Sequence, residues 1–297
     1  MRCRHFHGPD KRIRLRVTAV VFGLFLAQGA ALCGAEALLD VRQTIQLPYV
    51  PVDMQVSAQG NWVYLLNDQG VLLIYSADGK LKGTVTVGPE IDQIKSGPRE
   101  DIVFLLSRKK GTLQVAAITI RESIDIEGAP VKGDIAAPVT IAVFSDFQCS
   151  YCARLGQILD QVLAQHPKQV KVVFKHFPLR GHTFAVEAAQ AAVAAQSLGK
   201  FWEFHDLLFE HYASLGQDKL KEIAAALDLE WTALEKRMQA PAVMARIEAD
   251  KQNGENAGVR GTPAVFVDGL MLRDKSLRGF EQAIEAALQN LSTGGKP

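Results

Sequence analysis

Two cysteines three positions apart, Cys149 and Cys152, are the residues of this sequence best suited to do chemistry. The apolar, β-branched run at residues 139–144 predicts a buried strand just before them. Apolar side chains at helical spacing follow as far as about residue 165. A cysteine between strand and helix lies where free backbone N–H groups and the helix dipole favour a thiolate. The spacing therefore predicts a reactive dithiol at a helix start.

Two other uses of a C-x-x-C pair stay open at this point. A disulfide between Cys149 and Cys152 closes so small a loop that it would stabilise the fold by only about 2 kcal/mol. Zinc needs two further ligands, and His176 and His182 are available, but the sequence has no second C-x-x-C pair. We expect neither a metal nor a cofactor.

The first 37 residues have the pattern of a secretory signal peptide. Basic residues between Arg2 and Arg16 precede an apolar run at residues 17–32, and Ala35-Glu36-Ala37 is a cleavage pattern of small residues. An uncleaved membrane anchor is the alternative, although the run is shorter than the roughly 20 residues that a span needs. Lipidation at Cys33 is disfavoured by the large Leu32 before it. We expect cleavage after Ala37.

Cysteine usage and charge then define the protein class. Cleavage removes Cys3 and Cys33, so the mature chain keeps a single C-x-x-C pair. One such pair in an exported chain is typical of a redox protein and fits poorly with a disulfide-stapled scaffold. We expect a periplasmic or secreted location. A net charge of +1 with 22% charged residues gives no indication of nucleic acid as a partner.

Residues 38–120 read as short strands and turns that repeat at a period of about forty. Residues 63–66 (V-Y-L-L) match residues 103–106 (V-F-L-L), and Val52-Asp53 matches Ile91-Asp92. Repeats of this kind resemble propeller blades, but a propeller needs about four. We expect a scaffold or interaction module that packs on the rest of the chain or forms a homodimer with another copy.

The remaining chain reads as a mixed α/β domain that begins near residue 121. Residues 124–126 read as a short first strand, and residues 170–175 as a strand that completes a βαβ unit with a parallel sheet. Residues 183–253 are almost entirely helical in pattern, and a strand near 264–269 and a helix at 278–291 follow. The histidines His176, His182, His205 and His211 are expected to be structural or to lie at the surface.

Three motifs, in this order, resemble the DsbA-like family of thiol–disulfide oxidoreductases. They are residues 138–152 (P-V-T-I-A-V-F-S-D-F-Q-C-S-Y-C), 199–206 (G-K-F-W-E-F-H-D) and 259–263 (V-R-G-T-P). The resemblance covers roughly residues 121–290 and implies a thioredoxin fold with a helical insertion. It also implies that Cys149 is the nucleophile and Cys152 the resolving thiol. A cis peptide bond between Thr262 and Pro263 would face them and present the Thr262 backbone to an extended substrate chain.

Two departures from the family pattern bear on the chemistry. Many members carry an acid six positions before the first cysteine, thought to help move the proton of the second; Val143 stands there, and the nearest acid is Asp146. Asp146 either takes that role or caps the turn. Ser150-Tyr151 replaces the Pro-His pair of strongly oxidising members, which implies a weaker oxidant. Tyr151, with Thr262 before the proline, is also similar to the dimeric disulfide isomerases.

The sequence thus predicts a signal peptide (1–37), an all-β repeat module (38–120) and an α/β thioredoxin-like domain with an inserted helical region (121–297). The expected function is disulfide exchange with exported proteins through Cys149 and Cys152, first as a dithiol oxidase that a membrane redox partner resets. The alternatives are an isomerase or reductase, and a redox-sensing assembly protein whose β module recruits a client. Thr262, Pro263 and Tyr151 are the expected substrate-binding residues.

Overall fold

A computed structural model of the chain describes residues 39–41 and 43–292. The chain divides into two compact units, residues 1–46 and 47–297. The described residues of the first unit form no helix or strand, and the predicted signal peptide lies outside the described residues. Among the residues that the structure describes, no helix is both long and apolar enough to cross a bilayer.

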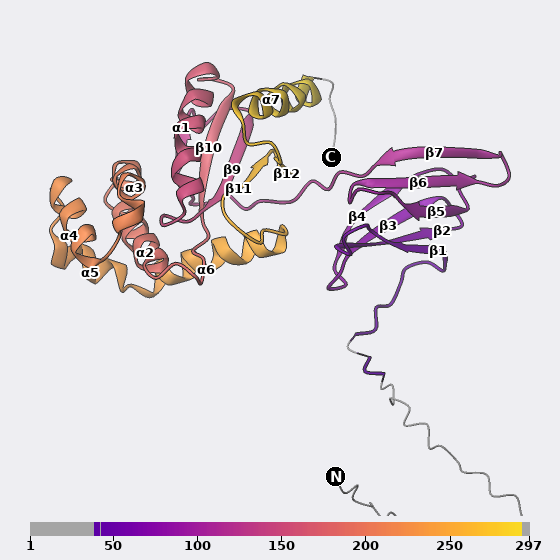
Figure 1. Cartoon of the computed structure of the whole chain (residues 1–297), viewed down its shortest axis with the longest axis horizontal. Coiled ribbons are helices and arrows are strands. Elements are labelled where there is room, and N and C mark those ends of the chain that lie inside the picture. The colour runs from indigo at the N-terminus through magenta and orange to yellow at the C-terminus, as the bar shows by residue number, and fades with distance from the viewer. Residues whose placement is uncertain (1–38, 42, 293–297) are drawn as a thin grey trace, which may run out of the picture. The chain divides into compact units, whose positions relative to one another are not determined.

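Seven strands form two antiparallel sheets, which we call the β module (Figure 1). The first sheet contains, in spatial order, β1 (Pro51–Val56), β2 (Trp62–Asn67), β3 (Val71–Ser76) and β4 (Leu81–Thr86). The second contains β5 (Gln93–Ser96), β6 (Ile102–Ser107) and β7 (Thr112–Ala117). Each predicted repeat therefore forms a sheet of its own, and the described residues form no closed propeller.

The other strands form one five-stranded sheet in the order β12-β11-β9-β10-β8. Its central strands β9 (Val139–Ser145) and β10 (Val170–His176) pair in parallel through α1 (Ser150–Gln165), so the predicted βαβ unit is confirmed. The outer strands pair antiparallel with their neighbours; they are β8 (Val131–Gly133), β11 (Ala264–Val267) and β12 (Leu270–Met271). This sheet is the thioredoxin-like fold that the sequence predicts.

Helices cover both faces of this sheet, which explains why β9 is apolar along its whole length. α1 and α7 (Leu277–Ser292) bury one face. On the other face, α6 (Pro241–Asn256) comes so close at Gly254 that a Cβ there would lie 2.9 Å from the rings of Phe144 and Phe177. The glycine therefore permits the contact between helix and sheet.

The predicted helical insertion lies between β10 and β11 (Figure 1). Before α6 it contains α2 (Ala185–Gln196), α3 (Phe201–Glu210), the 3₁₀ turn η1 (Tyr212–Ser214), α4 (Gln217–Ala226) and α5 (Trp231–Met238). Seven buried alanines of α2 allow its neighbours to approach closely, and their core extends to Phe147 and Phe174 beside the cysteine turn. The insertion thus forms one wall of the site.

The strand predicted at residues 124–126 is wrong. The backbone N–H of Asp125 donates to Asn253 Oδ1 (3.1 Å), and the Asp125 carbonyl accepts from Lys175 Nζ (2.5 Å). Side chains of α6 and β10 thus occupy the groups that a sheet would pair. The short strand lies further on, at β8, where it pairs with β10.

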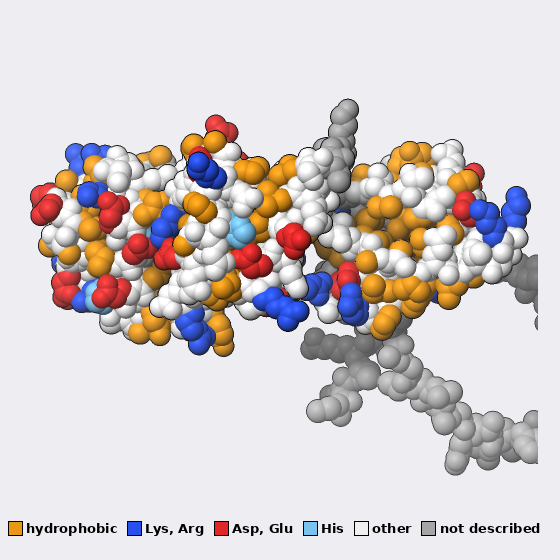
Figure 2. Space-filling view, turned by 90° about the horizontal axis from the view of Figure 1, so that it is seen from above, with side chains coloured by type: hydrophobic (Ala, Val, Ile, Leu, Met, Phe, Trp, Pro, Cys, Tyr) orange, Lys and Arg blue, Asp and Glu red, His pale blue; other side chains and the backbone are white. Residues whose placement is uncertain are grey.

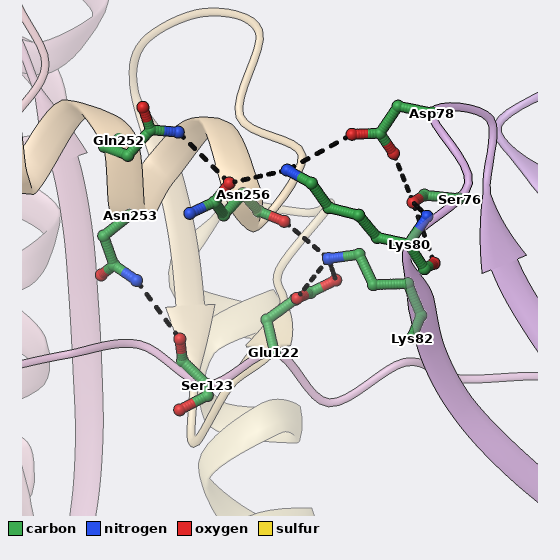
Figure 3. Close-up of polar contacts among 9 residues, drawn as sticks. All are labelled: Ser76, Asp78, Lys80, Lys82, Glu122, Ser123, Gln252, Asn253 and Asn256. Atoms are coloured by element: carbon green, nitrogen blue, oxygen red, sulfur yellow. Dashed lines mark hydrogen bonds and ion pairs between the residues drawn. The ribbon is translucent and has the colours of Figure 1, made fainter. Parts of the chain in front are cut away.

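Within the second unit, polar contacts connect β4 and the turn before it to the segment after β7 and to the end of α6 (Figure 3). Lys82 Nζ lies 2.9 Å from Glu122 Oε2 and 2.6 Å from the carbonyl oxygen of Asn256. Because the Lys82 and Glu122 side chains are mostly buried, solvent screens this ion pair little. The division between residues 120 and 121 into separate domains stays a prediction.

Candidate active site

Cys149 lies at the N-terminus of α1, directly after the turn that follows β9. Its φ of −82° and ψ of 115° are the extended values of an N-cap residue, and its carbonyl accepts the first helical bonds, from Cys152 and Ala153. The side chain is 6% exposed, and its sulfur lies 3.5 Å from the carbonyl oxygen of Thr262. Unpaired N–H groups at a helix start stabilise negative charge, so this position suits a sulfur that attacks or leaves as an anion.

Cys152 lies one turn further along α1 and is almost fully buried. Burial raises the pKa of its thiol to about 12, although hydrogen bonds with the Ser145 hydroxyl and the backbone of Asp146 act in the opposite direction. Both cysteines are free thiols in this structure. Burial thus holds Cys152 as a neutral thiol.

This asymmetry predicts selective alkylation. At neutral pH, iodoacetamide is expected to modify Cys149 and leave Cys152 intact, because a pKa near 12 leaves about a thousandfold less thiolate than an ordinary cysteine has. Peptide mass spectrometry of the labelled native protein checks this result. Labelling after unfolding is the control and should reach both cysteines, whereas equal labelling of both in the native state would contradict the assignment.

The peptide bond between Thr262 and Pro263 is cis, as the family resemblance implies. β11 begins directly after it and pairs with β9, which brings Thr262 next to the cysteine turn. The third expected substrate-binding residue, Tyr151, is 66% exposed on α1, and the Arg154 guanidinium lies 4.4 Å from its ring centroid. An exposed aromatic ring thus lies two positions from Cys149 in the sequence.

Asp146 is a buried turn residue with two occupied carboxylate oxygens. Oδ1 accepts from the N–H of Gln148 at 2.7 Å, and Oδ2 accepts from the N–H of Leu179 at 2.7 Å. Oδ2 also lies 2.9 Å from Nδ1 of His182. These bonds hold the cysteine turn and the segment after β10 together, which favours the capping role over the proton-transfer role. Through Asp146 Oδ2, His182 is part of the hydrogen bonds that hold this turn.

A cavity of about 40 Å³ lies beside Cys152, and the sequence did not indicate it. Ser145, His205, Asp206 and Lys132 are among the residues that line it. Nδ1 of the buried His205 lies 2.7 Å from Asp206 Oδ1, and burial lowers the pKa of the imidazole. The volume has room for a water molecule next to Cys152. His205 belongs to the motif at residues 199–206, but only tertiary packing brings it to the cavity.

His176, at the end of β10, lies buried among the rings of Phe147, Phe174 and Phe201. Its Nε2 has no hydrogen-bond partner, and burial lowers the pKa of the imidazole from 6.5 to about 4, against the raising effect of nearby Asp250. The ring is therefore neutral at physiological pH.

Acid is expected to destabilise the protein through His176. The unfolded state takes up the proton more readily than the folded state does. Burial of the neutral His176 ring therefore contributes fully to the free energy of unfolding above pH 6.5, and this contribution is lost as the pH falls toward 4. The loss is on the order of 3 kcal/mol. Urea unfolding of wild type and His176→Phe between pH 6.5 and 4 measures this loss. The free energy of unfolding of the variant should fall less with decreasing pH than that of wild type, and an equal fall in both proteins would contradict the prediction.

Among the described residues, no group of three or more His, Cys, Asp or Glu side chains is arranged to hold a metal ion.

The fold and the dithiol turn together define the class of a thioredoxin-fold thiol–disulfide oxidoreductase. The chain belongs to the thioredoxin family, whose family model, described as "Thioredoxin", matches residues 125–286.

Two solved structures share this fold. A thioredoxin-like oxidoreductase from Silicibacter pomeroyi is 28% identical, with a TM-score of 0.50 over 55% of this chain and 94% of the other. BdbD from Bacillus subtilis is 22% identical, with a TM-score of 0.52 over 58% of this chain and 98% of the other. The resemblance to DsbA-like oxidoreductases is confirmed at the level of the fold.

Relatives among curated proteins are much longer chains. The protein named Na(+)/H(+) antiporter NhaA 1 from Mycolicibacterium gilvum is 34% identical over 49% of this chain, and the match spans 24% of that protein. A protein named Na(+)/H(+) antiporter NhaA from Herminiimonas arsenicoxydans is 26% identical over 76% of this chain and 36% of its own length. The chain therefore spans only about a quarter to a third of these relatives.

Proposed function

We propose that the protein exchanges disulfides with exported proteins through the Cys149–Cys152 couple, as a dithiol oxidase. One observation carries the proposal: a cysteine at a helix start has its sulfur 3.5 Å from the Thr262 carbonyl, with a second thiol buried one turn behind it. Cys149, at the helix start beside Thr262, is the sulfur that a substrate can reach, and Cys152 is the natural leaving and resolving group.

In the oxidising direction, a substrate thiolate attacks Cys149 of the Cys149–Cys152 disulfide. The S–S bond breaks, a substrate–Cys149 disulfide forms, and Cys152 leaves with the electron pair and takes up a proton. A second substrate thiolate then attacks the substrate sulfur and releases Cys149. The substrate loses two electrons and two protons to the dithiol, and a membrane redox partner is proposed to remove them.

The proton of Cys152 needs a route because the thiol is buried and weakly acidic. The cavity lined by Cys152 and His205 supports such a route. An alternative route is needed because Val143 stands at the position where many family members have an acid. His205 and Asp206 are proposed to relay the proton through a cavity water. Asp146 is proposed to shape the turn, since its carboxylate oxygens are occupied.

Substrate binding is assigned to Thr262, Pro263 and Tyr151. Backbone groups of an extended substrate can pair with Thr262 as an added strand, and the exposed Tyr151 ring offers a surface for an apolar side chain. Substrates presented this way are unfolded or flexible segments.

The reduction potential tests the oxidase against the isomerase and reductase alternatives. A value near that of DsbA, about −120 mV, supports oxidation, and one near −180 mV supports isomerisation. A value near −270 mV, as in thioredoxin, would replace the oxidase proposal by a reductase. A redox-sensing assembly protein would fail to turn over model peptides at all.

Export is proposed from the pattern of residues 1–37. The N-terminal sequence of protein recovered from an exporting host should begin at Leu38. A chain that keeps its N-terminus and sediments with membranes would support the anchor alternative and overturn cleavage.

A further inference from the structure

The two sheets of the β module stack face to face and share one core. We call the stacked surfaces the inner faces and the opposite surfaces the outer faces. Residues directly opposite each other in paired strands lie on the same side of a sheet, and neighbours along a strand alternate. The inner face of the first sheet comprises Tyr64, Leu66, Leu72 and Ile74, and that of the second comprises Ile94, Val103, Leu105 and Ala116.

Both outer faces carry apolar side chains too. The outer face of the first sheet includes Met54, Val63, Leu65 and Tyr75, and that of the second includes Phe104, Leu106, Leu113 and Val115, with Gln93 and Lys95 on its edge strand β5. Met54 is 57% exposed, and Leu113 and Val115 are 63% and 66% exposed. Figure 2 shows hydrophobic side chains gathered over the β module on the side where β7 lies in Figure 1. The outer face of the second sheet and the β1 side of the first sheet's outer face lack the neighbouring layer that each inner face has, whereas Leu65 and Tyr75 are buried.

The strand register shows that the outer face of each sheet has the same arrangement of residues as the inner face of the other sheet. Leu66 pairs with Leu72 as Leu106 pairs with Leu113. Tyr64 pairs with Ile74 as Phe104 pairs with Val115. The outer face of the second sheet is therefore equivalent, position by position, to the inner face of the first.

The converse equivalence holds for the other pair of faces. Met54 pairs with Leu65 as Ile94 pairs with Leu105. Val63 pairs with Tyr75 as Val103 pairs with Ala116. The outer face of the first sheet is thus equivalent to the inner face of the second sheet, which is the surface that packs on the first sheet. The two outer faces are complementary in the way that the two inner faces are.

We infer that copies of this chain associate head to tail through the β module. The outer face of the second sheet of one copy packs on the exposed β1 side of the first sheet's outer face in the next copy, in the way that the two inner faces pack within one chain. A contact between two different faces closes into a ring when the rotation permits. With the four to eight blades typical of propellers, closure takes about two to four copies.

Part of one outer face is already covered within the chain. Leu47 packs against Leu65, Leu73 and Tyr75, and leaves Met54 and Val56 exposed. The contact with another copy therefore centres on the β1 side of this face. Because the inference uses only the β module, it stands or falls independently of the redox function.

Sedimentation velocity of the purified full chain tests the inference. Wild type is expected at about two to four times the mass of one chain. Val115→Asp and Met54→Asp each place a charge in one outer face and should each give a single chain. Ile135→Asp is the matched control: Ile135 is exposed outside the β module, at 76%, and its replacement should leave the mass unchanged.

Mixing the two variants distinguishes a head-to-tail contact from a symmetric one. Each variant keeps the face that the other has lost, so an equal mixture should form pairs of chains and nothing larger. A symmetric contact would let one of the variants associate as well as wild type, which would overturn the inference. A monomeric wild type, or association that both substitutions leave intact, would overturn it as well. Thiol–disulfide exchange and circular dichroism confirm that each variant is folded.

Discussion

Cys149→Ser protein is expected to show no thiol–disulfide exchange above the uncatalysed background. Serine keeps the size of the side chain but cannot form the mixed disulfide through which the exchange proceeds. Since Cys152 is nearly inaccessible and has a pKa near 12, it cannot replace the lost nucleophile. Oxidation of a model dithiol peptide, followed by mass spectrometry, measures the effect.

Cys152→Ser is the informative partner variant. It keeps the attacking sulfur and loses the resolving one. When it is given a peptide that already contains a disulfide, the Cys149 thiolate displaces one peptide sulfur as a thiolate, and the Cys149–peptide disulfide should accumulate and be visible on a non-reducing gel. Unchanged exchange by Cys149→Ser would remove the proposed function. Accumulation of the mixed disulfide in Cys149→Ser rather than in Cys152→Ser would reverse the two roles.

Asp146→Ala is expected to lower the free energy of unfolding by about 3–5 kcal/mol. The carboxylate is buried, and its loss leaves the N–H groups of Gln148 and Leu179 without acceptors, each at about 1–3 kcal/mol. Loss of the contact with His182 adds to this. Urea denaturation followed by circular dichroism gives the value.

Asp134→Ala is a matched control. Asp134 forms the same type of turn bond, with the N–H of Ala136 at 2.9 Å, but is exposed to water. Its replacement should lower the free energy of unfolding by less than about 1 kcal/mol. A second variant, Asp146→Asn, separates the two roles considered for the acid: if it unfolds like wild type yet resolves mixed disulfides slowly, the proton role returns and the capping role is insufficient.

The thioredoxin-like fold could be predicted because its signals are local. A continuous apolar run, a helical stripe and a second apolar run specify β9, α1 and β10, and the parallel pairing follows from their order. The C-x-x-C pair and the Thr262–Pro263 bond are equally visible in the sequence. Their closeness in space, at 3.5 Å between Cys149 Sγ and the Thr262 carbonyl, depends on the pairing of β11 with β9.

Features that depend on packing between distant segments could not be predicted. Residues 124–126 have a strand-like pattern, but Asn253 and Lys175 occupy their backbone groups. His205 reaches the cavity behind Cys152 only because the helical insertion packs there. In the β module, the forty-residue repeat is visible in the sequence, and Tyr64 corresponds to Phe104 forty positions on. The register shows that Ile74, opposite Tyr64, corresponds to Val115, opposite Phe104, which is forty-one positions on.

The recessed position of Cys149 has a consequence for when the protein acts on a client. A sulfur that is 6% exposed beside the Thr262 carbonyl can be reached only by a cysteine on a mobile stretch of chain. Once a client has folded, its cysteines are held in place and largely buried, and the approach is blocked. On the proposed function, disulfide transfer then competes in time with the folding of the client, and clients that fold slowly benefit most.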